Sequence, residues 1–375
     1  MAHFLILADD ISGAAETAGA IAAATSARVE LRLVPSADPA PDVLVIDTNS
    51  RGVVPGQAAE LSRAAAGSAP GQFIYKKVDS LLRGNIRAEL EGLDRAAAGI
   101  VAALAVPRAH RTVSGGVMHV AGTALHHTAA WAHEAGVAPS SIGAALGLPS
   151  AIIPLEVVRG SALDAAVLTV LAAGEIAVCD GETEDDLDRV AAMIIRLDRP
   201  IVAVGTGGLV RSIAALLGLA AGEPVFRPGA DRIIAVVGTL VPSARDQVAR
   251  LVETGLRQVT LRPGIPVLLD GADAVVTLAA DPTWSALAIE GVLSDVAAAI
   301  RGLDGRTDLV LTGGHTARMV LDALGVTRLY AEDEVEAGAV LSTTLTGSAV
   351  VTRPGSFGDD ESLVRIVSHL RGTQS

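Results

Sequence analysis

Short apolar runs alternate with amphipathic helical segments along most of the chain, and this order restricts the fold more than any other feature. Nearly every apolar run ends in a polar turn, and most of these turns lead into a helical segment. In the first half we expect strands at 3–8, 28–34, 43–46, 72–77, 100–106, 175–179 and 201–204, and helices after 13 up to about 25, at 55–66, 85–98 and 185–195, and before 217. This order is typical of a parallel sheet flanked by helices and joined by right-handed crossovers. The sequence therefore predicts an α/β protein.

The pattern restarts in the second half, after a stretch rich in Ala, Gly and Pro at 220–229. Strands are expected here at 232–237, 267–269, 274–278, 309–311 and 349–352, and helices from 242, at 285–300, before 325 and up to 370. A chain of 375 residues exceeds a comfortable single core, because domains average about 150 residues. We therefore predict two domains, 1–226 and 227–375, each with a mainly parallel sheet flanked by helices.

The composition excludes several classes of protein. A net charge of −13, from 29 basic and 42 acidic residues, argues against binding to nucleic acid or to an anionic membrane surface. The single cysteine, Cys179, excludes an intramolecular disulfide framework and a multi-cysteine metal site, and we expect it to pack as a small apolar residue of a cytoplasmic protein. No apolar run approaches the length of a membrane span.

The stretch 75–90 is the leading candidate for a functional site. It begins at the end of an apolar strand, concentrates charge within nine positions and passes through a Gly-Asn pair into an amphipathic helix. Its charged and amide side chains before that helix are Lys76, Lys77, Asp79, Arg83 and Asn85. Ligands of α/β proteins usually lie at such strand–helix junctions. The alternative is a solvated turn without a ligand.

Two further strand ends carry complementary charges. Asp9 and Asp10 follow the first strand, and Arg51 follows the third. Phosphoryl transfer to a hydroxyl needs a carboxylate that orients the hydroxyl and cations that balance the phosphoryl charge. Asp9 and Asp10 could instead simply cap the following helix. Adjacent strand residues face opposite ways, so Lys76 and Lys77 cannot both face one site.

Glycine-rich turns follow three expected strands of the second half. They are Gly238-Thr239 with nearby Ser243, the run Gly313-Gly314-His315-Thr316, and the turn from Gly355 to Gly358. Glycine lets a backbone approach a phosphate closely, and Thr316 could cap the following helix. No Gly-Lys-Ser/Thr follows at Walker A spacing, and each turn alone could be a plain tight turn. Together the three turns predict a nucleotide cradle.

A segment at 107–128 interrupts the strand–helix rhythm and is expected to be a functional loop or lid. Five of the eight histidines lie in or just after it, at positions 110, 119, 126, 127 and 133. No pair has the helical i,i+4 spacing with a supporting carboxylate, so we predict no metal site and expect them to line or cover a polar pocket. No nucleophile elbow or Cys-His arrangement supports covalent hydrolysis.

Taken together, these motifs resemble the four-carbon acid sugar kinase family. The resemblance runs in order through Asp9 to Thr17, Asp47 to Arg51, Tyr75 to Asn85, Val237 to Gln247, Thr312 to Ala317 and Gly355 to Gly358. Its most specific block is Lys-Lys-Val-Asp-Ser-Leu-Leu-Arg-Gly-Asn. The family implies ATP- and Mg²⁺-dependent phosphorylation of threonate, erythronate or an oxo-tetronate, usually at the terminal hydroxyl. It also implies an acid-sugar domain followed by an ATP domain, with the active site in the cleft between them.

Carried over by position, the resemblance assigns the site residues to two sides. The acid-sugar side would consist of Asp9, Asp10, Arg51, Lys76, Asp79, Arg83 and Asn85. The nucleotide side would consist of Ser243, Gly313, Gly314, His315, Thr316, Gly355 and Gly358. One aspartate among Asp9, Asp10 and Asp79 would act on the acceptor hydroxyl, and Arg51 or Arg83 would bind the substrate carboxylate.

Two other functions remain open at this point. The first is a non-catalytic sensor of a nucleotide or sugar acid with the same fold. The second, a Rossmann-type dehydrogenase, lacks Gly-x-Gly-x-x-Gly after the first strand of either half. The expected partners are a small sugar acid and ATP, with no nucleic acid and no membrane, and the protein could form a homo-oligomer.

Overall fold

The structure is a computed structural model. It describes residues 4–373 except 26, 37, 72, 94–97, 133, 135, 198, 220, 223, 224, 240, 280, 282 and 356. Several positions named from the sequence therefore lie outside the described residues, namely 3, 72, 94–97, 133, 220, 223, 224, 240 and 356. The chain divides into two compact units, Met1–Ala221 and Gly222–Ser375. The domain boundary at 226–227 stays a prediction.

Unit 1 contains a fully parallel sheet with the strand order β2-β3-β1-β4-β11-β5-β10-β9. The strands are β1 (Phe4–Ala8), β2 (Val29–Arg32), β3 (Val43–Asp47), β4 (Phe73–Lys77), β5 (Ile100–Ala103), β9 (Ser150–Ile153), β10 (Ile176–Cys179) and β11 (Val202–Gly205). Most of their side chains are buried, as expected of parallel strands covered on both faces. Cys179 is one of them, which confirms its expected place in the core.

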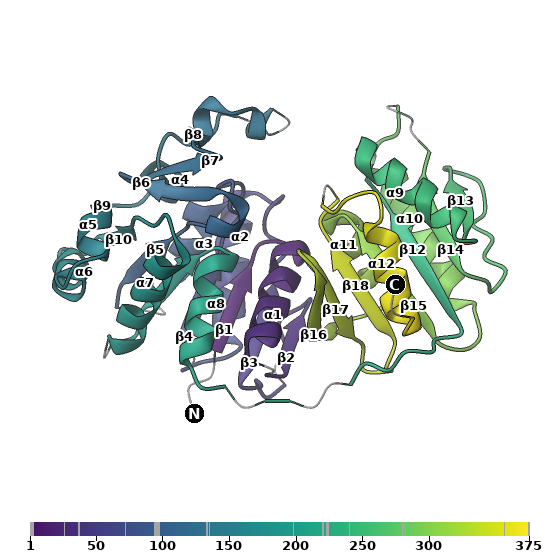
Figure 1. Cartoon of the computed structure of the whole chain (residues 1–375), viewed down its shortest axis with the longest axis horizontal. Coiled ribbons are helices and arrows are strands. Elements are labelled where there is room, and N and C mark those ends of the chain that lie inside the picture. Colours follow the sequence, from purple (N-terminus) through teal and green to yellow (C-terminus); the bar gives the residue numbers. More distant parts are fainter. Residues whose placement is uncertain are drawn as a thin grey trace. The chain divides into compact units, whose positions relative to one another are not determined.

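The helices of unit 1 form two layers. They are α1 (Ile11–Thr25), α2 (Pro55–Gly67), α3 (Ile86–Leu93), α4 (Ile142–Leu146), α5 (Leu155–Val158), α6 (Leu163–Ala172), α7 (Glu184–Arg196) and α8 (Gly207–Leu216). The connection from β1 through α1 to β2 moves toward one edge of the sheet, and the connection from β3 through α2 to β4 moves toward the other edge. Because both crossovers are expected to be right-handed, α1 and α2 lie on opposite faces of the sheet. Accordingly α1, α8 and α7 pack together in one layer and α2 packs on α3 in the other (Figure 1). The reversal makes β1 the switch point, where ligands of such sheets bind.

The segment expected as a loop or lid has structure of its own. After the short turn Pro107–Ala109 it forms a three-stranded antiparallel sheet of β6 (Arg111–Ser114), β7 (Val117–Val120) and β8 (Thr123–Ala124). Backbone hydrogen bonds between Val113 and Gly181 join β6 to the turn after β10. The sequence did not reveal these short strands, because a run of Gly and His conceals them, and the role of the segment as a functional loop or lid stays a prediction.

Unit 2 contains a mixed sheet with the order β13-β14-β12-β15-β18-β17-β16. Its strands are β12 (Arg232–Val237), β13 (Arg257–Leu261), β14 (Ala274–Leu278), β15 (Thr307–Thr312), β16 (Arg328–Glu336), β17 (Ala339–Thr343) and β18 (Ala349–Arg353). The first five strands in this order are parallel, and β17 and β16 continue the sheet antiparallel. Each unit thus has a mainly parallel sheet flanked by helices, as predicted.

Two pairs of helices cover the sheet of unit 2. The helices are α9 (Pro242–Glu253), α10 (Ala286–Arg301), α11 (Gly314–Leu324) and α12 (Ser362–Arg371). α9 packs on α12, and α10 packs on α11. Aliphatic side chains of α9 and α12, including Val248, Leu251 and Ile366, form a core with Val237 and Val351 of the sheet. Gly325 ends α11 in a left-handed conformation, as the sequence predicted.

One predicted strand of unit 2 was wrong. Residues 267–269 form an irregular connection, and the strand that pairs with β14 is β13, some ten residues earlier. The short apolar run before Leu269 resembled a strand, whereas β13 is mostly exposed and polar and gave no apolar signal. The hairpin of β16 and β17 was also missed, because charged residues interrupt β16.

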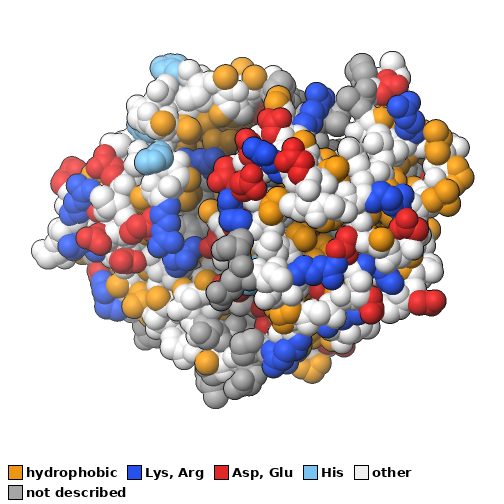
Figure 2. Space-filling model, turned by 45° about the vertical axis from the view of Figure 1, so that its right-hand side comes forward, with side chains coloured by type: hydrophobic (Ala, Val, Ile, Leu, Met, Phe, Trp, Pro, Cys, Tyr) orange, Lys and Arg blue, Asp and Glu red, His pale blue; other side chains and the backbone are white. Residues whose placement is uncertain are grey.

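The surface is mixed in charge. Lys and Arg side chains are interspersed with Asp and Glu side chains over the face shown in Figure 2, and no continuous basic area appears among the described residues of that face. Within the described part of the chain, no helix has both the length and the apolar character needed to cross a membrane.

Candidate active site

Three neighbouring strands of unit 1 bring the predicted charged residues together. β1 lies between β3 and β4, and all three strands run in the same direction. Their carboxyl ends therefore share one edge of the sheet, at the switch point. The side chains that meet there, called the charged cluster below, are Asp9, Asp10, Arg51, Asp79 and Arg83.

Arg51 joins the two aspartates that follow β1. Its Nε and Nη2 donate to the Asp9 carboxylate at 2.7 and 3.0 Å, and its Nη1 and Nη2 donate to Asp10 at 2.8 and 3.0 Å. Asp10 also accepts from the backbone N–H of Gly13 at 2.9 Å and so caps α1. Capping and participation in the cluster, which the sequence analysis treated as alternatives, occur together in Asp10.

Asp79 and Arg83 form the second half of the cluster. The Nε and Nη2 of Arg83 donate to opposite oxygens of Asp79 at 2.8 Å each, a bidentate pair. Asp79 also accepts from the backbone N–H of Leu81 at 3.0 Å, and its carboxylate lies 3.8 Å from Nη2 of Arg51. The remaining guanidinium nitrogen of Arg83 donates to Glu134 at 3.2 Å. Both predicted carboxylate-binding arginines are thus already paired with acidic side chains of unit 1.

The three aspartates of the cluster differ in their acidity. Burial opposes ionisation of all three, but Arg51 outweighs this at Asp9, and Arg83 with Arg51 outweighs it at Asp79, so the pKa of each falls below its usual range. At Asp10 burial, reinforced by the charge of Asp9, outweighs Arg51 and raises the pKa. Asp10 is also the most exposed, with 21% of its side chain accessible against 3% for Asp9 and 10% for Asp79.

Gly84 and Asn85 fix the backbone around the cluster. Gly84 has a φ of 95°, and a Cβ at this position would lie 2.8 Å from Oδ2 of Asp9, so only glycine fits. The Asn85 side chain donates to the carbonyl oxygens of Ser50 at 2.9 Å and Val53 at 2.8 Å. These bonds connect the start of α3 to the turn that carries Arg51. In this structure Asn85 therefore positions the turn, and its role as a substrate ligand stays a prediction.

The two lysines of β4 lie on opposite faces, as strand alternation required. Lys76 is fully buried, and its ammonium lies 3.0 Å from Glu89 of α3, which also accepts from Ser50. Lys77 instead lies 3.5 Å from Glu16 of α1, and its charge acts on Asp10 and Asp79. The substrate ligand predicted from the sequence was Lys76, but Lys77 is the lysine whose charge acts on Asp10, the most exposed carboxylate of the cluster.

The segment after β5 contributes contacts that the sequence analysis missed. Arg111 of β6 donates through Nη1 to the hydroxyl of Ser80, and Trp131 donates to the carbonyl of Leu81 at 2.7 Å. With Glu134 these residues hold the 80–83 turn from outside the main sheet. No sequence signal identified them, because the segment has no clear periodicity.

The histidines of this segment do not form a metal site among the described residues. The rings of His126 and His127 lie 4.1 Å apart, and His119 lies 3.1 Å from the carbonyl of Val117. No group of three or more His, Cys, Asp or Glu side chains in the described part of the chain is placed to hold an ion. His133 lies outside the described residues.

The predicted glycine-rich turns of unit 2 share one edge of its sheet. β12, β15 and β18 are adjacent and parallel, and they end before Gly238, Gly313 and Pro354. An added Cβ at Gly238 would overlap the Thr316 hydroxyl, and one at Gly355 would lie 2.9 Å from Thr239. The turns that follow β12, β15 and β18 are therefore in close contact.

Within the described part of the chain, no side chain caps the first turn of α11. Gly313 is its N-cap and supplies no side chain, and Thr316 packs against Gly238 without capping the helix, contrary to the prediction. The amides at the start of a helix without a side-chain cap remain available to an anion. His315 is exposed on this turn, and Gly314 is half-buried beside it. This geometry suits a phosphate group.

Two buried side chains, Arg353 and Gln247, form hydrogen bonds that fix the turn after β18. Arg353 donates to Phe357 and, at 2.9 Å, to Ser362, and the Gln247 amide lies 3.2 Å from the carbonyl oxygens of Phe357 and Gly358. These contacts fix the turn that contains Gly358. The sequence analysis did not foresee that Arg353 is buried, because arginine at a strand end is usually exposed.

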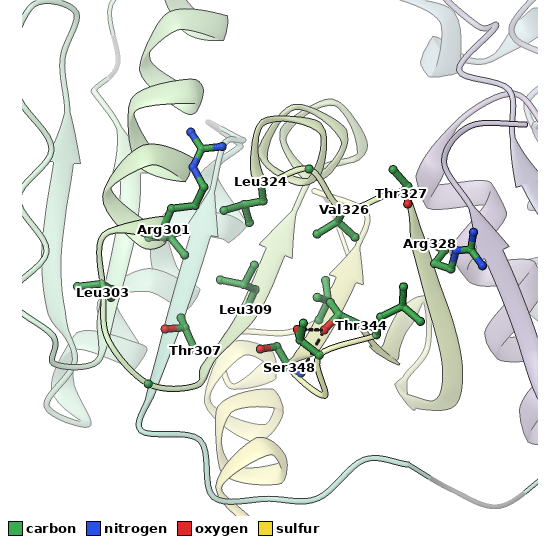
Figure 3. A pocket seen from close by; sticks show the side chains of 16 residues that line it. Arg301, Leu303, Thr307, Leu309, Leu324, Val326, Thr327, Arg328, Thr344 and Ser348 are labelled. Atoms are coloured by element: carbon green, nitrogen blue, oxygen red, sulfur yellow. Dashed lines mark hydrogen bonds between the residues drawn. The ribbon is translucent and has the colours of Figure 1, made fainter. Parts of the chain in front are cut away.

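Two cavities of unit 2 lie at opposite ends of its sheet. One of about 520 Å³ adjoins Thr239, α9 and the carboxyl ends of β13 and β14. The other, of about 450 Å³, lies among Leu309, Leu324 and Val326 near the first residues of β15 and β18 (Figure 3). Only the first is beside the glycine-rich turns, and Ser243 lies within the first turn of α9, next to its lining residue Ala244.

Comparisons with known proteins match two domain families to the chain. A family described as "Sugar-binding N-terminal domain" matches residues 4–213, and one described as "Nucleotide-binding C-terminal domain" matches residues 268–363. A D-threonate kinase of Cupriavidus necator is 34% identical over 96% of both chains. A D-threonate kinase of Bordetella bronchiseptica is 31% identical over 98% of this chain and 97% of that protein, and a D-erythronate kinase of Heliobacterium modesticaldum is 29% identical over 94% and 80%.

Solved structures share the fold. A Salmonella typhimurium LT2 crystal structure superposes with a TM-score of 0.80 at 21% identity over 98% of both chains. A Bordetella bronchiseptica structure with bound citrate, a domain-swapped dimer, has a TM-score of 0.51 at 26% identity over 100% of both chains. From the two matching domain families and the full-length relatives, the chain belongs to the four-carbon acid sugar kinase family.

Proposed function

We propose that this protein is an ATP-dependent kinase that phosphorylates a hydroxyl of a four-carbon sugar acid, with D-threonate as the first candidate. The observation that carries the proposal is the meeting of three carboxylates and two arginines at the switch point of unit 1. The full-length relatives that are named D-threonate kinases support the substrate class. The Bordetella bronchiseptica crystal structure contains bound citrate, so that protein has a carboxylic acid as a ligand.

Asp10 is proposed as the carboxylate that accepts the proton of the acceptor hydroxyl. A general base works best when its pKa is nearer to the operating pH, and Asp10 is the one aspartate of the cluster whose pKa is raised. Its greater exposure also allows a substrate hydroxyl to approach. In the reaction the hydroxyl oxygen forms a bond to the γ-phosphorus, the bond from phosphorus to the bridging oxygen breaks, and ADP leaves.

The glycine-rich turns of unit 2 are proposed to hold the phosphates of ATP. Uncapped amides at the start of α11 can donate to phosphate oxygens, and the close contact of Gly238 with Thr316 brings the turn after β12 beside them. Ser243 and the turn from Gly355 to Gly358 extend the same edge. Positioning and charge stabilisation supply most of the rate acceleration in phosphoryl transfer.

Mg²⁺ is proposed to enter as a complex with the phosphates of ATP. The described residues contain no cluster of three or more side chains that could hold an ion, so no step is assigned to an ion held by the protein alone. Mg²⁺ commonly uses only one or two protein carboxylates together with nucleotide phosphates. The active site between the two domains, the homo-oligomer and the cytoplasmic location remain predictions.

The experiment is to incubate the protein with ATP, Mg²⁺ and single four-carbon acids, and to follow ADP release. The panel contains D- and L-threonate, D- and L-erythronate and an oxo-tetronate. We expect turnover with at least one acid and much slower turnover with the matching uncharged alcohols. Thermal stabilisation by an acid or ATP without ADP formation would indicate the sensor instead. Absence of turnover with every acid would defeat the proposed substrate class.

A further inference from the structure

Three arginines lie in or beside the charged cluster, and they differ in how many carboxylates already pair with them. Arg51 makes four hydrogen bonds to Asp9 and Asp10, and Arg83 makes a bidentate pair with Asp79 and a further bond to Glu134. A guanidinium has five N–H donors, so Arg51 keeps one and Arg83 keeps two, and each of them already faces two carboxylates that offset its charge. The substrate carboxylate needs a different partner.

Arg111 has that capacity. Its contact in the described part of the chain is the donation from Nη1 to the Ser80 hydroxyl, which is neutral. Its Nε is buried and has no hydrogen-bond partner. A buried, unpaired donor on a charged group is costly, so a native structure rarely retains one without a use.

The charges around Arg111 place it at the same site. Asp79 and Glu16 attract its guanidinium and Arg83 repels it. Burial lowers the pKa of Arg111, and the acidic neighbours offset this only in part. Among the described residues no carboxylate forms an ion pair with Arg111, whereas Arg51 and Arg83 have theirs in place.

The backbone at Arg111 is also well fixed. Its carbonyl accepts from the N–H of Val106 at 2.8 Å, and its own N–H donates to the carbonyl of Val106 at 3.1 Å. On the other side it pairs with Val120 of β7. A side chain on such a support can bind a ligand with little loss of conformational entropy.

We propose that Arg111 binds the carboxylate of the sugar acid and so selects acids over uncharged polyols. This inference rests on the proposed function and adds the residue that reads the acid group. The planar guanidinium of Arg111 would offer Nε and a free Nη hydrogen to the two carboxylate oxygens, the geometry that arginine favours. Ser80 would hold the opposite side of the guanidinium.

The test compares Arg111→Met and Arg111→Lys with the wild type and with Arg87→Met. Arg87 is an exposed arginine of α3 whose carboxylate partner is Glu91. For each protein, kcat/KM is measured with D-threonate and with threitol, the polyol without the carboxylate. We expect the preference for the acid to fall about 100-fold in Arg111→Met, because a site built for a polar group discriminates strongly. Arg111→Lys should lose less, and Arg87→Met should keep the wild-type preference.

A structural role of Arg111 predicts a different result. If Arg111→Met lowered kcat/KM for acid and polyol by the same factor, or left the KM for D-threonate within twofold of the wild type, the proposal would be wrong. If the polyol gives no measurable rate, the KM values decide, because Arg111→Met should raise the KM for D-threonate and leave the KM for ATP unchanged.

If the variant is inactive, calorimetric titration with D-threonate in the absence of ATP makes the same comparison. Weaker binding to Arg111→Met than to Arg87→Met supports the proposal, and equal binding contradicts it. Wild-type turnover is measured first, so a failure of the kinase proposal itself is seen separately.

Discussion

The charged cluster of unit 1 and the glycine-rich edge of unit 2 occupy the same place in their respective sheets but are built in opposite ways. In unit 1 carboxylates and guanidiniums extend from the strand ends and pair with one another. In unit 2 the turns offer backbone amides, and Arg353, the charged residue at the end of β18, is buried beneath its turn. The charged cluster thus depends on side-chain charge, and the glycine-rich turns depend on backbone shape. Substitutions that remove a charge should therefore impair the first, and substitutions that add bulk at a glycine should impair the second.

The largest effect on turnover is expected from Asp10→Asn. Asparagine can still cap α1, so the fold should survive, but it cannot accept the proton of the acceptor hydroxyl. We predict that kcat falls by about 10² to 10⁴-fold. Asp164→Asn, which weakens an exposed pair with Arg196, is the matched control and should leave kcat unchanged. A kcat of Asp10→Asn within threefold of the control would remove Asp10 from the mechanism.

Lys76→Met tests whether the buried lysine supports the cluster from below. It would leave Glu89 buried without its cation, and breaking a buried pair costs about 3–5 kcal/mol of unfolding free energy. Urea denaturation measures this loss. Arg196→Met, at an exposed pair, should cost at most about 1 kcal/mol. If the two variants were equally stable and Lys76→Met raised the KM for the acid, the ligand role first predicted for Lys76 would return.

Gly238→Ala tests the edge of unit 2 through shape alone. The new methyl group would overlap Thr316 and push apart the turns after β12 and β15. We expect a stability loss of about 1–3 kcal/mol, typical of overpacking. We also expect a higher KM for ATP and an unchanged KM for the sugar acid. Gly291→Ala, in α10 with open space at the Cβ, is the control and should be neutral or slightly stabilising.

The smallest effects concern the pH dependence of stability within the cluster. The pKa of Asp79 is lowered, so its ionised form stabilises the fold above about pH 4 and this contribution is lost as pH falls further. The pKa of Asp10 is raised, so its contribution is present at low pH and is lost as pH rises through the folded pKa. We compare the unfolding free energy of each variant with that of the wild type at each pH. On going from acid pH to pH 7, this difference should become more unfavourable for Asp79→Asn and more favourable for Asp10→Asn. Urea titrations at pH 7, 5 and 3.5 measure both trends, and equal slopes would contradict the assigned difference.

The same contrast explains what could be predicted from the sequence. Strand ends with Asp, Arg and Gly are visible in a sequence because parallel strands bring their carboxyl ends to one edge, and Asp9, Arg51 and Asp79 do meet there. Which side chains pair with one another depends on packing in three dimensions. Sequence alone could not tell that Arg51 pairs with two carboxylates while Nε of Arg111 has no hydrogen-bond partner among the described residues. The weakest predictions concerned β13 and the small sheet from β6 to β8, where polar residues hide the strands.

The central claim is that the γ-phosphoryl group of ATP passes to an acid held at the charged cluster. The most direct measurement is ³¹P NMR of the wild-type protein with ATP, Mg²⁺ and D-threonate. The account predicts a new phosphomonoester resonance that grows in step with ADP, and its absence when the acid is omitted. Inorganic phosphate as the sole product, or ATP that stays intact while D-threonate binds, would contradict the claim.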